Sequence, residues 1–169
     1  MAESFEAARH IILENVSPLE PESVDLLHLI GRVLAEDIRA PWDLPRWDNS
    51  EMDGFAVRAV DCQQFARLQV DGYLPAGATA TGIFVRPGTV VRIMTGAPIP
   101  VGCDAIVPIE DTESEENSII IKRAVNVGDY IRSRGSDIAA DEVILSAGTI
   151  LRPAEINLLA SLSRLQASV

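Results

Sequence analysis

Short apolar runs, separated by glycine, proline and aspartate, fill the middle of this 169-residue chain and limit the folds that it can adopt. They lie at residues 55–60, 65–70, 83–85, 90–94, 105–109 and 119–121. Each run has the length of a strand, and turn residues at this spacing are typical of antiparallel all-β structures. We therefore predict a small antiparallel barrel or sandwich in this stretch.

Helical patterns occur near the two ends of the chain, and the apolar density of residues 23–40 suggests a short helix, a break at Gly31 and then a strand. Apolar residues recur at helical spacing from Ser4 to about Asn15, and Pro153 is well placed as the first residue of a second helix. Hydrophobic residues make up 47% of the chain but aromatic residues only 5%, so the core must be aliphatic. The composition is globular and excludes a disordered chain.

The charge balance argues against anionic partners. The formal net charge is -11, so the overall field repels nucleic acid and anionic membranes. An anionic substrate would need a local basic pocket, and the dense candidates are Lys122, Arg123, Arg132 and Arg134. The alternative is that these are solvated charges paired with Asp129 and Asp137.

Nothing in the sequence indicates export, a membrane span or a cysteine-based metal site. Cys62 and Cys103 are far apart and match no zinc spacing. The acidic start lacks the features of a signal peptide, and no apolar run could span a bilayer. We therefore expect a cytoplasmic protein with reduced thiols.

The stretch at residues 45–58, P-R-W-D-N-S-E-M-D-G-F-A-V-R, concentrates short acceptor side chains beside an apolar run. Asp48, Glu51 and Asp53 could supply oxygen ligands for Mg²⁺ or a general base. The alternative is structural, because Asp53-Gly54 is a strong hairpin signal and Asn49-Ser50 can close a turn.

A second stretch, R-I-M-T-G-A-P-I-P-V-G at residues 92–102, favours the functional interpretation of residues 45–58 over the structural one. Together the two resemble the signatures of the molybdopterin molybdenumtransferases, the family of bacterial MoeA and the gephyrin E domain. A third match at residues 128–138 departs from the family pattern at Tyr130, where asparagine is usual, and at Ser136, where glutamate is usual. Long motifs in the correct order are far more specific than a single glycine pattern.

The resemblance covers essentially all of this chain but only the front part of the family. It implies an α+β, mostly β fold in which residues 1–44 and 138–169 form a small α/β linker and dimerisation domain. Residues 45–137 would form an inserted β-barrel-like domain. The family's larger α/β domain and C-terminal β domain are not represented, so we expect Val169 to be followed by more chain in the natural protein.

The resemblance also implies an activity in molybdenum cofactor biosynthesis. Family members insert molybdate into adenylylated molybdopterin and release AMP in a step that requires a divalent metal, here expected to be Mg²⁺. Their active site is divided between two subunits of a dimer, so this chain would supply one wall and be inactive alone. The implied partners are a second copy and the molybdopterin adenylyltransferase. The alternative is a dimerising or adaptor module that has lost the chemistry.

Matching the motifs residue by residue implies the site. Asp53, Thr95 and Asp137 are the predicted catalytic residues, with Asp53 and Asp137 as metal ligands or around the attacking water. Thr95 would donate to a phosphate or pterin oxygen. The predicted substrate-binding set is Asn49, Ser50, Gly96, Arg132 and Arg134. Within it, the arginines are suited to the phosphates, and Asn49 and Ser50 to holding the Asp53 loop.

Overall fold

The computed structural model describes residues 4–169, which divide into two compact units. The end unit comprises the chain up to Arg39 together with Val143–Val169, and the inserted unit is Ala40–Glu142. The predicted domains, residues 1–44 with 138–169 and residues 45–137, and the linker and dimerisation role of the first stay predictions. The predicted fold class, α+β and mostly β, is confirmed.

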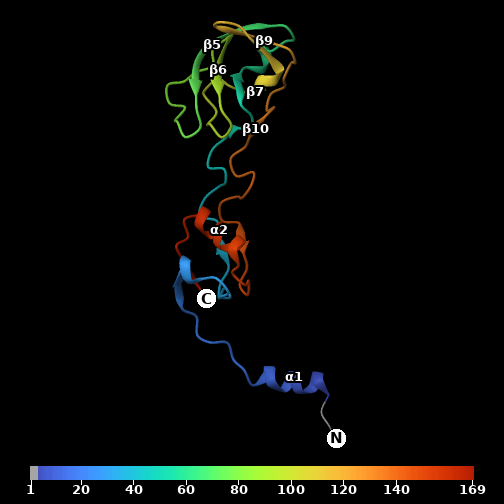
Figure 1. Cartoon of the computed structure of the whole chain (residues 1–169), viewed down its shortest axis with the longest axis vertical. Helices are drawn as coiled ribbons and strands as arrows, with labels where there is room; N and C mark the ends of the chain where they lie inside the picture. The colour runs from blue at the N-terminus through green and yellow to red at the C-terminus, as the bar shows by residue number, and fades with distance from the viewer. Residues whose placement is uncertain (1–3) are drawn as a thin grey trace. The chain divides into compact units, whose positions relative to one another are not determined.

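A curled six-stranded sheet forms most of the inserted unit (Figure 1). Its spatial order is β7-β4-β6-β5-β9-β8. The strands are β4 (Gly54–Val57), β5 (Arg67–Leu74), β6 (Thr89–Ile93), β7 (Ala105–Pro108), β8 (Thr112–Ser114) and β9 (Ser118–Ile121). The sheet is a half-barrel and not a closed one. Because the central strands pack on both faces, the apolar residues along them are buried almost without interruption.

One pairing in this sheet differs from the prediction. Four of its strand pairs are antiparallel, but β5 and β6 run parallel, with Gln69 opposite Thr89 and Leu74 opposite Ile93. Parallel neighbours need a long crossover connection, and residues 75–88 supply it. The prediction of a wholly antiparallel barrel was therefore wrong at this pair, because run spacing alone does not show which strands are neighbours.

The core of the inserted unit is aliphatic and lies on both sides of the sheet. Alternate residues of β4 point to opposite faces, so that Phe55 and Val57 join one buried cluster and Ala56 joins the other. Val90 and Val91 of β6 divide between the clusters in the same way. All five are at most 2% exposed. The strand ends that carry polar residues are therefore held on a close-packed support.

Two shorter segments of the inserted unit pair beside the sheet. β3 (Asn49–Ser50) runs antiparallel to β10 (Ile131–Arg132), with Ser50 opposite Ile131 and Asn49 opposite Arg132. Leu44 forms an isolated antiparallel bridge with Ile138. Segments that are almost ninety residues apart in the sequence therefore lie side by side.

The end unit has its own small core. Its paired strands are β1 (Ser23–Asp25) with β12 (Gln166–Ser168) and β2 (Ile38–Arg39) with β11 (Val143–Leu145). The predicted second helix is present as α2 (Pro153–Ser161), with Pro153 at its start and Leu159 fully buried. The remaining large members of this cluster are Leu29, Leu34, Ile38 and Leu151.

The predicted first helix is also present but buries nothing within the described chain. Helix α1 (Phe5–Glu14) begins after Ser4, whose hydroxyl accepts a hydrogen bond from Ala7 N at 3.1 Å. Phe5 and Ile12 are 78% and 62% exposed.

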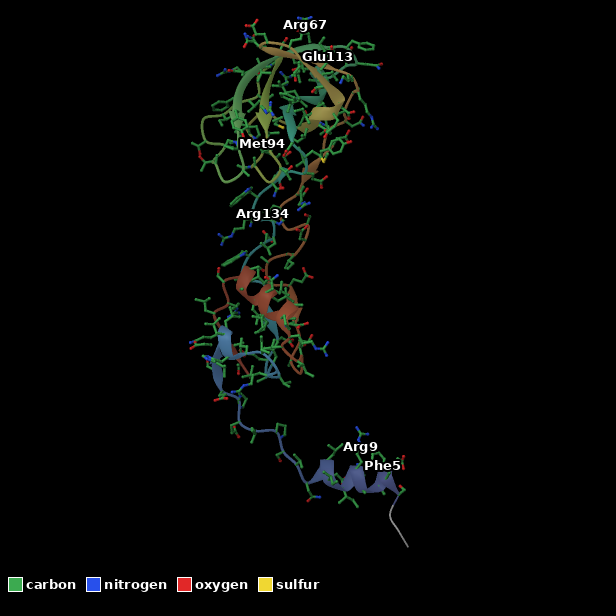
Figure 2. All side chains as sticks on the ribbon, in the orientation of Figure 1. Phe5, Arg9, Arg67, Met94, Glu113 and Arg134 are labelled. Atoms are coloured by element: carbon green, nitrogen blue, oxygen red, sulfur yellow. The ribbon has the colours of Figure 1, made fainter. Side chains whose placement is uncertain are left out.

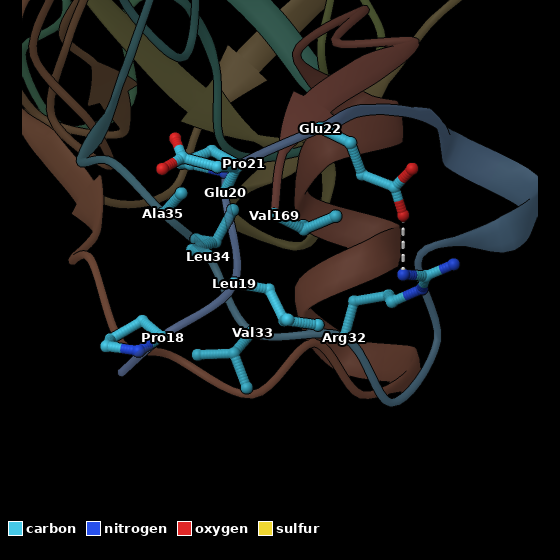
Figure 3. A pocket seen from close by; sticks show the side chains of 10 residues that line it. All are labelled: Pro18, Leu19, Glu20, Pro21, Glu22, Arg32, Val33, Leu34, Ala35 and Val169. Atoms are coloured by element: carbon cyan, nitrogen blue, oxygen red, sulfur yellow. Dashed lines mark hydrogen bonds and ion pairs between the residues drawn. The ribbon is translucent and has the colours of Figure 1, made fainter. Parts of the chain in front are cut away.

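Elsewhere in the end unit, residues 18–22 and 32–35 and Val169 line a hollow of about 530 Å³ (Figure 3). Arg32 and Glu22 join across its rim at 2.8 Å.

Candidate functional site

Asp53 and Thr95 form the best-defined polar pair at one end of the sheet. Asp53 directly precedes β4, and Thr95 follows the end of β6 by two residues. Asp53 Oδ1 accepts hydrogen bonds from both the backbone N–H and the hydroxyl of Thr95, each at 2.7 Å. Because the two strands are hydrogen-bonded neighbours, the pairing of β4 with β6 brings these residues together.

Asp53 is ionised at neutral pH. The Thr95 hydroxyl and then the Thr95 N–H stabilise its charged form and lower the pKa of the carboxyl, and Arg92 adds a smaller attraction. This lowered pKa makes Asp53 a weak proton acceptor but a stable negative charge. Of the two roles predicted for it, ligation of a cation fits this chemistry better than general-base catalysis.

The structure decides against the hairpin interpretation of Asp53-Gly54. The strands before and after the dipeptide, β3 and β4, belong to different sheets and do not pair. Gly54 instead lies inside the six-stranded sheet, where a Cβ atom would overlap the backbone of Val107. Glycine is required there because the neighbouring strand occupies the space of a side chain.

Ser50 and Asn49 are buried, and Ser50 holds the approach to Asp53. The Ser50 hydroxyl donates to the carbonyl of Met52 at 2.6 Å, which closes the turn that leads to Asp53. Ser50 also exchanges backbone hydrogen bonds with the Thr95 side of the site, donating to Ala97 O at 3.0 Å and accepting from Gly96 N at 2.8 Å. This agrees with a supporting role for Ser50, and it also means that the Gly96 N–H already has a partner.

Thr95 is similarly engaged. Both of its donors, the N–H and the hydroxyl, go to Asp53. A direct hydrogen bond from Thr95 to a substrate oxygen would therefore require one of these contacts to break. In this arrangement Thr95 orients Asp53, and its predicted contact with substrate stays a prediction.

Arg132 and Asp137 are connected to Asn49 and Ser50 through the pairing of β3 with β10. Arg132 is directly opposite Asn49, and its Nη1 lies 3.9 Å from Asp137 Oδ2. Ser136 Oγ donates to Asp137 Oδ1 at 3.3 Å. Both charged side chains are about half exposed, so their ion pair is weak and can open to a ligand. Its presence agrees with the alternative that basic residues here pair with Asp137.

Arg134 has a different partner from the one that the sequence suggests. Its Nε donates to Asp43 Oδ2, and its backbone N–H donates to Asp48 Oδ1 at 2.7 Å. The Asp43 carboxylate also accepts from Ala140 N at 2.8 Å. Sequence reasoning missed Asp43, and no local signal marks it, because its partners lie about ninety residues away.

A connected network links most of the predicted residues within the inserted unit. It runs from Asp53 through Thr95, Gly96 and Ser50 to β3 and then across to Arg132 and Asp137. Within residues 4–169, no hydrogen bond or ion pair joins Asp53 directly to Asp137. The same residues contain no group of three or more His, Cys, Asp or Glu side chains arranged to hold a metal ion. The predicted metal pair thus stays a prediction.

The network lies at one end of the inserted unit (Figure 2). Met94, which precedes Thr95, lies at the end of the sheet away from Arg67 and Glu113, and Arg134 lies beyond Met94 on the same side. Glu113 is therefore remote from the site. Glu110 is closer to it, because the N–H of its neighbour Ile109 donates to the Asp53 carbonyl at 3.0 Å.

Arg92 is a second residue that sequence reasoning did not single out. It lies on β6 opposite Phe55, is exposed, and contributes to the field that lowers the pKa of Asp53. The available signal was its position three residues before Thr95 in the same motif. Its guanidinium is a further cationic group that could bind a phosphate at this site.

The two cysteines take no part in the site. Burial raises the pKa of the Cys62 thiol to about 12 and that of Cys103 to about 11. Both are free thiols, and their protonated forms are poor nucleophiles at neutral pH.

In the described part of the chain, no helix is long and apolar enough to cross a membrane.

Comparison with curated proteins finds several molybdopterin molybdenumtransferases. The protein of that name from Synechococcus elongatus is 40% identical over 165 residues, which cover 94% of this chain and 41% of the relative. Molybdopterin molybdenumtransferase 2 from Mycobacterium tuberculosis is 40% identical over 164 residues, covering 94% of this chain and 40% of the relative. The chain thus spans about two fifths of the length of these relatives.

Solved structures and family models agree with those matches. The crystal structure of the molybdopterin biosynthesis MoeA protein from Pyrococcus horikoshii OT3 aligns with a TM-score of 0.89 at 34% identity, over 95% of this chain and 44% of that one. The family model described as the MoeA N-terminal region, domains I and II, matches residues 3–163. With its motifs, its fold and this match in agreement, the chain belongs to the MoeA N-terminal family.

Proposed function

We propose that this chain acts in molybdenum cofactor biosynthesis, as part of an enzyme that inserts molybdate into adenylylated molybdopterin and releases AMP. The observation that carries the proposal is the Asp53–Thr95 pair, an ionised carboxylate held in place at the exposed end of a rigid sheet. Family membership supports the chemistry, because the curated relatives carry the name molybdopterin molybdenumtransferase.

In this proposal the chain supplies one wall of a site completed by a second subunit. Asp53 provides a fixed negative charge, and Thr95 holds that charge in place. Arg132 belongs to β10 and Arg134 follows it by two residues; both are exposed and can contact phosphate oxygens. The chain spans about two fifths of its relatives, and the rest of such a site would come from residues outside it.

A divalent metal would need ligands beyond the described residues. Mg²⁺ is usually held by one or two carboxylates together with substrate phosphates and water. Asp53 meets the first requirement, because it is ionised and exposed, and Asp137 is the second candidate. When bound, the metal would stabilise charge that develops on the phosphate during cleavage. We therefore propose that Mg²⁺ is coordinated jointly by carboxylates of the protein and phosphate oxygens of the substrate.

A second candidate function is a dimerising or adaptor module without catalytic activity. The observation that favours it is helix α1, whose apolar residues are exposed and available to another protein surface. The occupied donors of Thr95 and Gly96 are also compatible with a purely structural network. The two candidates differ in one measurable property, which is dependence of AMP release on Asp53.

The test is the Asp53→Asn variant of the natural protein in which these residues occur. It keeps the size of the side chain and removes the charge, so we expect AMP release to fall by about 100-fold or more. Release of AMP from adenylylated molybdopterin is measured with molybdate and Mg²⁺ present. A rate within about threefold of the unchanged protein, a difference under about 1 kcal/mol, would remove the catalytic role of Asp53.

The matched control is Asp71→Asn. Asp71 lies on β5 and pairs with Arg86 at 3.2 Å, outside the hydrogen bonds that join Asp53, Thr95 and Ser50. We expect this variant to release AMP at the unchanged rate. If the unchanged natural protein released no AMP at all, the adaptor function would be favoured instead.

A further inference from the structure

We propose that Asp43 is a positioning residue of this site, which presents Arg134 to a phosphate-bearing substrate and fixes the loop that carries Asp137. This inference rests on the function proposed above. It concerns a residue outside the three matched motifs, and it depends on contacts between segments 41–48 and 133–140 of the inserted unit.

One carboxylate holds both ends of the loop. Asp43 Oδ2 accepts from Arg134 Nε, and Asp43 Oδ1 accepts from Ala140 N at 2.8 Å. The Asp43 side chain is only 18% exposed, whereas that of Arg134 is 65% exposed. The buried partner therefore acts as the fixed point, and the guanidinium extends from it toward solvent.

Backbone contacts keep the loop aligned on the same segment. Leu44 N donates to Ile138 O at 2.8 Å, Asp137 N donates to Leu44 O at 2.9 Å, and Gly135 N donates to Pro45 O at 3.0 Å. Residue 135 has a φ of +72°, and a Cβ atom there would lie 3.2 Å from Asp43 Oδ1. The loop thus packs closely against the carboxylate, and Asp137 lies between its anchored ends.

The contact with Asp43 uses only one face of the Arg134 guanidinium. Donation from Nε leaves the two terminal nitrogens, which are the donors that a bidentate phosphate contact requires. Hydrogen bonds from Ala140 and then Arg134 lower the pKa of Asp43, so the carboxylate stays charged at neutral pH. A charged anchor therefore orients a cation whose remaining donors are exposed.

The Asp43→Asn variant tests whether Asp43 orients Arg134 or only stabilises the fold of the loop. The amide oxygen can still accept from Ala140 N, so the loop keeps its backbone tie, but the amide NH₂ cannot accept from Arg134 Nε. We expect the Arg134 Nε–H signal in the ¹⁵N NMR spectrum of the 169-residue chain to be protected from exchange and to lose that protection in the variant. An unchanged Nε–H signal would overturn the role of Asp43, whatever the enzyme does.

The kinetic arm uses the natural protein and a double-mutant cycle. We expect Asp43→Asn to raise KM for adenylylated molybdopterin about tenfold and to change kcat by less than threefold, because orientation of a binding group is lost and the reacting atoms are untouched. Arg134→Ala should raise KM at least as much, and adding Asp43→Asn to it should cause little further change.

The outcomes separate this proposal from the function on which it rests. An active enzyme whose KM is unchanged in Asp43→Asn, or whose two substitutions act additively, would overturn the role of Asp43 and leave the function standing. Absence of AMP release from the unchanged natural protein would overturn both. Asp71→Asn, which removes a carboxylate that pairs with Arg86 outside segments 41–48 and 133–140, serves as the control for loss of charge.

Discussion

Asp53 and Asp137, the two carboxylates predicted to be catalytic, lie in regions that are held by different forces. Asp53 precedes a strand whose residues are all buried, and its position depends on a close-packed aliphatic core. Asp137 lies in a loop whose residues 132–140 are mostly exposed, and its position depends on hydrogen bonds to segment 43–48. The first region resists small changes, whereas the second depends on single polar contacts.

This difference indicates how such a site can combine rigidity with adjustment. A charge that must stay fixed is best placed on a packed sheet, where displacement disturbs many contacts at once. A loop tied by a few hydrogen bonds opens at lower free energy and can follow a ligand. Three substitutions compare the two regions. Both tryptophans, Trp42 and Trp47, lie in the inserted unit, so their fluorescence reports its unfolding.

The largest effect is expected for Gly54→Ala in the sheet. The new Cβ would overlap the Val107 backbone, which cannot rotate away as a side chain could. We expect a loss of at least about 3 kcal/mol in the free energy of unfolding, measured by tryptophan fluorescence in urea. Gly72→Ala is the comparison: alanine is strained at its φ of +114°, but nothing lies within 4 Å of the added carbon, so we expect a smaller loss of about 1–2 kcal/mol. Equal losses in both variants would contradict the steric explanation.

A smaller loss is expected for Gly135→Ala in the loop. An alanine at a φ of +72° costs about 1–2 kcal/mol, and its methyl group would also press on Asp43. Gly128→Ala has a positive φ as well but nothing within 4 Å of the added carbon. Urea unfolding should therefore rank Gly135→Ala below Gly128→Ala in stability. The reverse order would show that the loop does not pack on Asp43.

The smallest effect is expected for Tyr130→Asn, next to β10. Tyr130 has a φ of 57°, a left-handed conformation that asparagine tolerates better than most residues. Relief of this strain offsets the loss of a half-buried ring, so we expect a net change within about 1 kcal/mol. Tyr130→Val should be less stable than Tyr130→Asn despite its apolar side chain, since β-branched residues are strongly disfavoured there. A more stable valine variant would show that packing dominates.

The same residue is one of the two departures from the resembled family pattern. Its left-handed backbone conformation is one for which the asparagine of that pattern would be suited. Residue 130 contributes through its backbone, because the Tyr130 carbonyl accepts a hydrogen bond from Glu51 N at 3.0 Å. Ser136, the other departure, still donates a hydrogen bond to Asp137.

Much of the fold and part of the site could be predicted from local patterns. Short apolar runs indicated five of the six strands of the sheet within a few residues, and Pro153 marked the start of α2. The run at residues 83–85 was wrongly included, because it forms only an isolated bridge at Phe84. The motifs placed Asp53 and Thr95 in one site, where they are in contact. Local patterns also suggested a helix after Ser23, where the structure has a short strand and a 3₁₀ turn at Leu26–His28.

The sequence by itself determined the family and the fold class, because motifs, turn residues and short apolar runs are local properties. Only the tertiary structure decided that β5 and β6 run parallel, that Gly54 has no room for a side chain and that Arg134 is held by Asp43. Each of these depends on which distant segments become neighbours. That choice is made by the packing of the whole unit, since no single segment carries enough information to specify its partner.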